Sequence, residues 1–288
     1  RFERKGDLLG FVYLAPRSGT AIYEPLQWLG QVAKVEWLVG GQVIDTQDAN
    51  FSQFVAPTVM AQNLTKSISG YGEAAESRFY PLRFSFCENW QSAIPLVALQ
   101  YHDVEIRVTW GGSLTGAWEC YAHFIYLDTD ERSSLAAAPQ NMLITQTQKS
   151  VASNSTIQEL NLNHPVKYLA AADGSNLAIA ADNNKIKLQI NGTDVTDFKY
   201  TDPHYTAVSE YYHTCASVAA ASGDNKKRFI YPFCFDTGKL QPTGSLNFSR
   251  VDSARLVSET ASHTDDIYAV NYNIMRVESG MGGLMYSN

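Results

Sequence analysis

Residues Gln241–Asn288 read QPTGSLNFSRVDSARLVSETASHTDDIYAVNYNIMRVESGMGGLMYSN and combine two strand-like runs with a glycine-rich ending. In the second run two sets of side chains alternate, namely Tyr268, Val270, Tyr272 and Ile274 against Ala269, Asn271, Asn273 and Met275. A period of two places alternate side chains on opposite faces of a β-strand. We therefore expect Tyr268, Val270, Tyr272 and Ile274 to be buried together against a sheet partner.

Similar short strands, separated by tight turns, are predicted along the rest of the chain. Alternating or apolar runs predict strands at Gly6–Leu14, Lys34–Val39, Val104–Trp110, Trp118–Leu127, Lys185–Ile190 and Phe229–Phe235. Gly40-Gly41 and Asn191-Gly192 follow two of these runs and favour β-hairpins. Phe51–Met60 suggests a short helix, which Pro57 limits in length.

Length and composition favour an all-β chain of two domains. At 288 residues the chain exceeds the roughly 150 residues typical of one domain, and 45% of it is hydrophobic and 12% aromatic. Acidic residues at 128–131, two serines and three alanines predict a short helix between domains. We place the first domain at residues 1–127, the linker at 128–141 and the second domain at 142–288.

The charge and the cysteines argue against several functions. The net charge of −7 is the opposite of the basic footprint of a protein that wraps nucleic acid. No run reaches the roughly 18 apolar residues of a membrane span, so we expect no membrane insertion. The four cysteines contain no CxxC pair, and we expect reduced thiols without disulfides at Cys87, Cys120, Cys215 and Cys234.

Motifs of catalysis and cofactor binding are absent from the sequence. Gly111–Gly116 reads GGSLTG and lacks the lysine of a phosphate-binding loop. The six histidines form neither HxH nor HxxxH, and Asp128–Glu131 is followed by Ser133 where a calcium loop needs glycine. We predict no catalytic, cofactor or metal residues. Glycosylation sequons, which indicate surface at most, occur at Asn63, Asn154, Asn191 and Asn247.

Five blocks of sequence, in order along the chain, resemble one family. They are PLRFSF with Ile94–Tyr101, IYLDTDER, NLNHPVKYLA, QPTGSLNFSR with VNYN, and SGMGGLMYSN. Together they resemble the major capsid proteins of large, internally membraned icosahedral DNA viruses, the phycodnavirus and iridovirus group. The resemblance covers nearly the whole chain, from GDLLGFVYL to the last residue.

This resemblance implies a structural protein of the virion. It implies two jelly-roll sandwiches side by side, homotrimers that form pseudo-hexagonal capsomers, and an icosahedral shell over an internal membrane. Neighbouring capsomers and minor capsid proteins would be its partners, assembly would occur in the host cytoplasm, and no enzyme activity is implied. The resemblance implies that the first jelly roll lacks its N-terminal part here, so we expect fewer strands in 1–127 than in 142–288.

A carbohydrate-binding, lectin-like sandwich is the alternative function. The tyrosine-rich stretch His204–Tyr212, which we interpret as a loop, offers an aromatic platform for a sugar ring. An enzyme built on a jelly roll ranks third, because the histidine spacing lacks the metal cluster of such enzymes.

Overall fold

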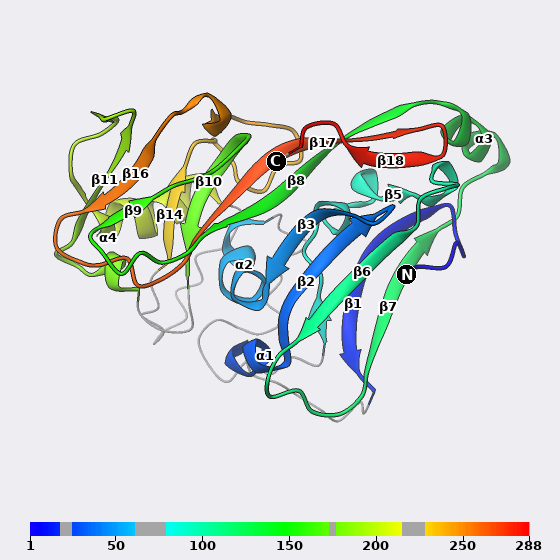
Figure 1. Ribbon diagram of the computed structural model, residues 1–288, viewed down its shortest axis with the longest axis horizontal. Coiled ribbons are helices and arrows are strands. Elements are labelled where there is room, and N and C mark those ends of the chain that lie inside the picture. The colour runs from blue at the N-terminus through cyan, green and yellow to red at the C-terminus, as the bar shows by residue number, and fades with distance from the viewer. Residues whose placement is uncertain (18–24, 61–78, 173–176, 215–227, 288) are drawn as a thin grey trace. The chain divides into compact units, whose positions relative to one another are not determined.

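The structure is a computed structural model, and it describes residues 1–17, 25–60, 79–172, 177–214 and 228–287. Strands dominate these residues, and the helices among them are short (Figure 1). The chain forms two compact units. Unit 1 lies within residues 1–52, 74–146 and 273–288, and unit 2 lies within 53–73 and 147–272.

Two antiparallel sheets make up most of unit 1. In the first, β1 (Leu8–Pro16) pairs with β4 (Tyr80–Pro81), β5 (Ile94–Pro95) and β7 (Trp118–Ile125). In the second, β2 (Val32–Val39) lies between β3 (Gln42–Asp48) and β6 (Val104–Trp110), as Figure 1 shows. Short helical segments connect the strands: α1 (Pro25–Gln31), η2 (Ser85–Cys87), η3 (Trp90–Ser92), η4 (Leu96–Ala98) and α3 (Thr129–Ala137).

The core of unit 1 is rich in aromatic rings. Trp37 of β2 is fully buried, and its ring centre lies 4.9 Å from that of Phe86. Phe84 and Phe86 stack against each other, and Trp28 of α1 contacts Tyr80. Such rings bury large apolar areas and explain why most of the irregular stretch 82–99 is buried, although Trp90 is exposed.

The glycine-rich ending forms a hairpin packed closely on unit 1. Strand β17 (Ile267–Glu278) turns through Ser279 and Gly280, both at positive φ, into β18 (Met281–Leu284). A two-residue turn with two positive φ angles matches the twist of the flanking strands. A Cβ at Gly282 would lie 2.7 Å from Leu99 Cδ2 and 3.1 Å from Val39 Cγ1, so only glycine fits this contact.

Unit 2 also contains two antiparallel groups of strands. In one, β10 (Pro165–Ala171) pairs with β14 (Phe229–Pro232), β15 (Leu246–Asn247) and β17. In the other, β11 (Lys185–Ile190) pairs with β12 (Thr193–Asp194), β13 (Lys199–Tyr200) and β16 (Ala254–Ser258), and β16 also pairs with β9 (Ile157–Glu159). Between the two groups lies an apolar core that includes Val166, Leu188, Phe229, Leu256 and Ile267.

The helical segments of unit 2 are short as well. They are α2 (Ala56–Val59), η5 (Ala178–Ala180), α4 (Thr201–Pro203), η6 (His204–Val208), α5 (Ser209–His213) and η7 (Phe248–Arg250). A π-helical turn, η1 (Phe51–Val55), precedes α2. The short helix predicted over Phe51–Met60 is therefore confirmed.

Two long strands contribute residues to both units. Strand β8 (Gln140–Ser150) pairs with β17, and each strand changes unit along its length, at 146–147 in β8 and at 272–273 in β17. The compact units are therefore not the contiguous stretches 1–127 and 142–288 that the sequence predicts for the two domains. Residues 273–288 belong to the same unit as the N-terminal part of the chain.

One prediction for β17 is only partly right. Tyr268, Val270 and Tyr272 are buried, but Ile274 is only partly buried. The opposite row is buried too: Ile267 and Ala269 lie in the core of unit 2, and Met275 and Val277 lie in the core of unit 1. A period of two assigns residues to faces, but it does not reveal a strand covered on both faces.

A second prediction is wrong. His204–Tyr212 is not a loop but a run of helical turns, η6 and α5, that follows α4. Tyr205 from this run is buried and stacks on Tyr231 with ring centres 4.9 Å apart. Burial of one apolar face of these turns outweighs the weak local helix signal of the sequence.

Most other local predictions are confirmed. The Gly40-Gly41 and Asn191-Gly192 hairpins join β2 to β3 and β11 to β12, and α3 lies in the predicted linker with no buried residue. Among the described residues, seven strands (β1 to β7) lie in 1–127 and ten (β9 to β18) lie in 142–288, as expected.

Candidate interaction surfaces

The histidines and cysteines do not assemble into a reactive centre in the described part of the chain. No group of three or more His, Cys, Asp or Glu side chains there has metal-binding geometry. The ring of His102 contacts the Gly282 carbonyl at 2.8 Å, and that of His213 contacts the Cys234 carbonyl at 2.9 Å. These two rings hold loops in place.

Three of the four cysteines are free thiols. Cys87 and Cys234 are buried and Cys120 is exposed, while Cys215 lies outside the described residues. Burial raises the pKa of Cys87 to about 12 and also raises the pKa of Cys234, and desolvation by neighbouring groups raises the pKa of the exposed Cys120. Since the thiolate is the nucleophile, these environments do not activate the three thiols.

The acidic run of the linker caps a helix. Asp128 accepts a hydrogen bond from the Thr129 amide at the start of α3, and Asp130 and Glu131 lie in the first turn. Arg132 then forms a two-pronged ion pair with Asp7, with 2.8 Å from Nε to Oδ1 and 3.0 Å from Nη2 to Oδ2. The Leu127 amide and then Arg132 lower the pKa of Asp7. The acidic residues at 128–131 are therefore explained by the capping of helix α3.

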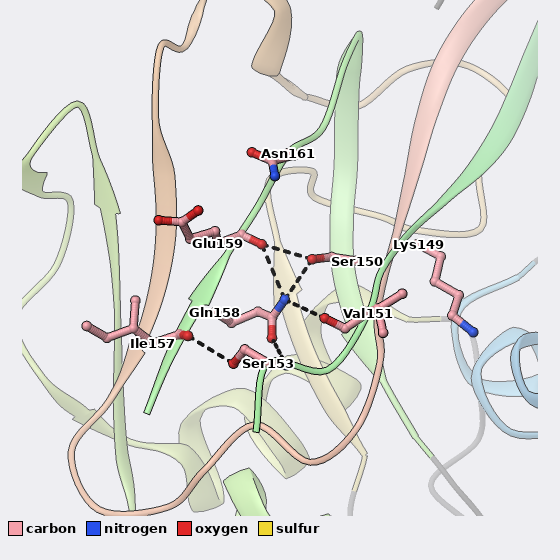
Figure 2. A pocket seen from close by; sticks show the side chains of 8 residues that line it. All are labelled: Lys149, Ser150, Val151, Ser153, Ile157, Gln158, Glu159 and Asn161. Atoms are coloured by element: carbon pink, nitrogen blue, oxygen red, sulfur yellow. Dashed lines mark hydrogen bonds between the residues drawn. The ribbon is translucent and has the colours of Figure 1, made fainter. Parts of the chain in front are cut away.

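A shallow hollow of about 490 Å³ lies beside β8 and β9 in unit 2. Figure 2 shows the eight residues that line it: Lys149, Ser150, Val151, Ser153, Ile157, Gln158, Glu159 and Asn161. Gln158 lies at its centre, where its amide nitrogen donates to Ser150 Oγ and to the Val151 carbonyl, and its oxygen accepts from the Ser153 amide.

Most polar groups of this hollow already bond to the protein itself. Ser153 Oγ donates to the Ile157 carbonyl and Ser150 Oγ to the Glu159 carbonyl. Lys149 forms an ion pair with Asp266 at 2.6 Å, which also accepts from the Ala152 amide. Neither serine contacts a general base, so the hollow does not have the geometry of nucleophilic catalysis.

An exposed aromatic group lies where the sequence suggested a sugar platform. Tyr211 and Tyr212 of α5 are each 71% exposed and contact each other edge to face. Phe235, 80% exposed, follows Cys234, whose carbonyl oxygen contacts the His213 ring. Tyr211 and Tyr212 therefore form an exposed pair and Phe235 is a further exposed ring, but Tyr205 of the same stretch is buried.

A larger aromatic surface lies on the outer face of β1 and β7 in unit 1. The ring of Phe11 stacks on His123 at 4.8 Å, and that of Tyr13 stacks on Tyr121 at 5.4 Å. We call these four side chains the aromatic face. This surface was not predicted from the sequence, although aromatic residues at i and i+2 in GFVYL and in CYAHF were a usable signal.

The asparagines of the described glycosylation sequons differ in their exposure and in their hydrogen bonds. Asn154 is exposed, whereas Asn191 accepts hydrogen bonds from the Asp252 and Ser253 amides and Asn247 accepts one from the Ser249 amide. Asn63 lies outside the described residues. Among the helices that the structure describes, none has the length and apolar character needed to cross a membrane.

Comparison with known proteins agrees with this fold. Residues 2–172 match the family described as "Major capsid protein N-terminus", and residues 175–283 match "Large eukaryotic DNA virus major capsid protein". The major capsid protein of Pyramimonas orientalis virus is 33% identical, covering 99% of this chain and 85% of that protein. That of Paramecium bursaria Chlorella virus 1 is 28% identical, covering 100% and 87%.

Solved structures show the same architecture. The PBCV-1 virus capsid subunit matches with a TM-score of 0.78 at 23% identity, covering 100% of this chain and 92% of that chain. The Faustovirus major capsid protein matches with a TM-score of 0.53 at 11% identity, covering 96% and 78%. The predicted fold class, all-β with two jelly rolls, is confirmed. The chain belongs to the major capsid protein family of large eukaryotic DNA viruses.

Proposed function

We propose that this chain forms homotrimers, that each trimer is a pseudo-hexagonal capsomer, and that the capsomers tile an icosahedral shell over an internal membrane. The observation that carries the proposal is the succession of two capsid-family matches, residues 2–172 and then 175–283, on a chain with two β-rich units. Two sandwiches per chain give six per trimer, which suits a hexagonal outline.

The mechanism is assembly rather than catalysis. Each unit has its own apolar core, so each is a stable building block whose surface is available for contacts. Within a capsomer, buried apolar area gives stability, because permanent homo-oligomeric interfaces are more apolar than the rest of the surface. Between capsomers, smaller polar contacts allow tiling to be corrected during growth. No catalytic residue, cofactor or metal is required.

The same proposal covers domains and partners. Residues 1–127 would supply most of the first jelly roll and 142–288 most of the second, with the linker at 128–141 around α3. The partners would be neighbouring capsomers and minor capsid proteins, without direct contact to nucleic acid and without membrane insertion. The protein would reside in the virion shell and assemble in the host cytoplasm.

Native mass spectrometry of capsomers released gently from particles tests the central claim. We expect a species of three chains that persists on dilution into the nanomolar range. A stable monomer or dimer at micromolar concentration would contradict the capsomer proposal. Electron microscopy of infected cells, with antibody against the chain, tests the site of assembly: label on shells in the cytoplasm supports it, and label restricted to the nucleus opposes it.

A further inference from the structure

Part of the buried core of unit 1 comes from residues that follow unit 2 in the sequence. Met275 is fully buried and Val277 is 1% exposed, and both lie in the same apolar cluster as Val39 of β2. Most of unit 2 is made of residues 147–272, so the ribosome synthesises these two side chains only after that unit. We call residues 273–287 the closing segment, because the core of unit 1 lacks these side chains until the segment docks.

The hairpin of the closing segment is held by contacts with early parts of the chain. The Tyr101 amide donates to the Gly280 carbonyl at 2.9 Å, and Nδ1 of His102 lies 2.8 Å from the Gly282 carbonyl oxygen. His102 and Gly282 are 180 positions apart in the sequence. Gly282 also packs so closely on Leu99 that a Cβ would lie 2.7 Å from Leu99 Cδ2. The docking site of the hairpin therefore consists of residues that are synthesised long before it.

Strand β8 of unit 1 also depends on the closing segment. It runs beside β17 (Figure 1) and, in the sheets of the described residues, pairs with no other strand. Ile144 of β8 is 3% exposed in the core of unit 1, and Gln146 Oε1 accepts from the Asn273 amide at 2.8 Å. Because a strand needs partners to be stable in water, this part of unit 1 also forms only when residues 273–278 are present.

The fold of unit 2 brings the start of the closing segment beside the end of the unit-1 part of β8. Within unit 2, Gln148 donates to Asn271 Oδ1 at 2.8 Å across more than a hundred intervening residues. Closing so long a loop costs entropy before the contacts across it form, so these contacts form late unless the loop itself has folded. Unit 2 can fold without the closing segment, since its described core cluster lies between Leu160 and Ala269.

We propose that the chain folds in the reverse of its order of synthesis: unit 2 folds first, and docking of the closing segment then completes unit 1. The native fold of unit 1 is thus conditional on a folded unit 2. A chain that is cut short or misfolded within unit 2 keeps an incomplete first unit with apolar core exposed. The folding order goes beyond the proposed function and does not depend on it. Its consequence for assembly, that only chains with both units folded enter capsomers, rests on the proposed function.

Refolding of the intact chain from urea tests this order. All five tryptophans, at positions 28, 37, 90, 110 and 118, belong to unit 1, so tryptophan fluorescence reports on that unit alone. Pulsed hydrogen exchange with mass spectrometry reports on unit 2 through the amides of β10 and β11, and on the closing segment through amides 274–278. We expect β10 and β11 to gain protection several-fold faster than amides 274–278, and these amides to gain it together with the native tryptophan signal.

A variant that blocks docking provides the second measurement. Gly282→Asp would force a side chain into the contact with Leu99 and bury a carboxylate there. Gly112→Asp is the matched control, because Gly112 is also in unit 1 and a Cβ there meets nothing within 4 Å. In Gly282→Asp, β10 and β11 should gain protection at the wild-type rate, whereas the tryptophan signal should form about tenfold more slowly or remain incomplete. Gly112→Asp should match the wild type in both.

Several outcomes would overturn the proposal. A native tryptophan signal that precedes protection of amides 274–278 is one, and a single rate for both units is another. A Gly282→Asp chain whose tryptophan signal forms at the wild-type rate, or whose β10 and β11 also stay unprotected, contradicts it as well. If this variant cannot be purified, the order measured in the wild type still decides. None of these measurements requires association, so a failed trimer test of the proposed function is distinguishable from a failure of the folding order.

Discussion

The side-chain amide of Asn273 in β17 donates a hydrogen bond to Gln146 Oε1 in β8 at 2.8 Å. Two residues away along each strand, Gln148 donates to Asn271 Oδ1, also at 2.8 Å. Gln146 additionally donates to the Ile44 carbonyl. The two asparagines of the VNYN sequence thus form one side of a ladder of amide hydrogen bonds between β17 and β8, the two strands that contribute residues to both units. Buried amides with matched partners fix register, because a slip of one residue would leave them unpaired.

Replacing Asn273 tests this ladder. Asn273 is buried, so Asn273→Ala should leave buried amide groups without a partner and lower the free energy of unfolding by about 1–3 kcal/mol. Urea denaturation measures the change, and a double-mutant cycle with Gln146→Ala isolates the pair. Asn161→Ala, at an exposed position, is the control. Additive effects of the two substitutions would show that the pair does not act as a unit.

Local features of this fold were accessible from sequence because single residues determine them. Asn191-Gly192 requires a particular turn, and Asp128 caps α3 with its own side chain. The return of 273–288 to unit 1 was not accessible, because it depends on contacts between residues more than a hundred positions apart, such as Asn273 with Gln146 and Gly282 with His102. Nor did alternation in β17 reveal that both of its faces are covered, since Asn271 and Asn273 look like a polar, solvent-facing row although both are buried and hydrogen-bonded.

For the candidate surfaces too, features that depend on residues far apart in the sequence could not be predicted. The absence of catalytic motifs in the sequence directed attention towards contact surfaces. The aromatic face escaped notice because it needs two strands, far apart in sequence, to place Tyr13 opposite Tyr121. The loop predicted over His204–Tyr212 was wrong: helical turns bury Tyr205, while Tyr211 and Tyr212 of the same stretch stay exposed.

Substitution of Gly282 probes the close approach of the C-terminal hairpin. Gly282→Ala would place a methyl group 2.7 Å from Leu99 Cδ2, and repacking this site should cost about 1–3 kcal/mol of unfolding free energy. Gly112→Ala is the matched control, since a Cβ there meets nothing within 4 Å. Thermal and urea denaturation of both variants provide the comparison. Equal stability of the two would mean that the hairpin does not pack as described.

Truncation of Tyr272 tests the buried row of β17. Tyr272 is 7% exposed, and its ring centre lies 5.2 Å from Nζ of Lys167, a buried lysine that also donates to the Thr237 carbonyl. Tyr272→Ala should lower the free energy of unfolding by about 3 kcal/mol or more, as large-to-small core changes do. Tyr200→Ala, at a half-exposed position, should cost much less. A loss below about 1 kcal/mol for Tyr272→Ala would reject its core role.

The cysteines and metal content remain predictions that chemistry can check. We expect four titratable thiols in unfolded, unreduced protein and no stoichiometric metal by elemental analysis. In the folded protein Cys120 should react with a thiol reagent before Cys87 or Cys234, because it alone of the three is exposed. Fewer than four thiols in the unfolded chain, or one zinc per chain, would overturn the expectation.

The last prediction concerns acid sensitivity and His263. This side chain is fully buried, and its backbone joins two loops, donating to the Ser155 carbonyl at 2.8 Å and accepting from the Asn154 amide at 2.9 Å. Burial lowers the pKa of the imidazole from 6.5 to about 4. The folded chain therefore holds the ring neutral in a range of pH where the unfolded chain is already protonated.

The sign of the pH effect follows from that difference. As the pH falls from about 6.5 towards 4, the unfolded state gains a proton that the folded state does not bind, so stability decreases with falling pH. A displacement from 6.5 to about 4 corresponds to a loss on the order of 3 kcal/mol, at about 1.4 kcal/mol per pH unit.

His263→Leu removes the titrating group while keeping an apolar side chain in the buried site. Urea denaturation at several pH values between 7 and 4 should show a shallower loss of stability for this variant than for the wild type. Substitution of an exposed histidine, His123→Leu, should leave the wild-type slope in place. If the wild type and His263→Leu lose stability in parallel over this range, carboxylates rather than His263 set the acid sensitivity of the fold.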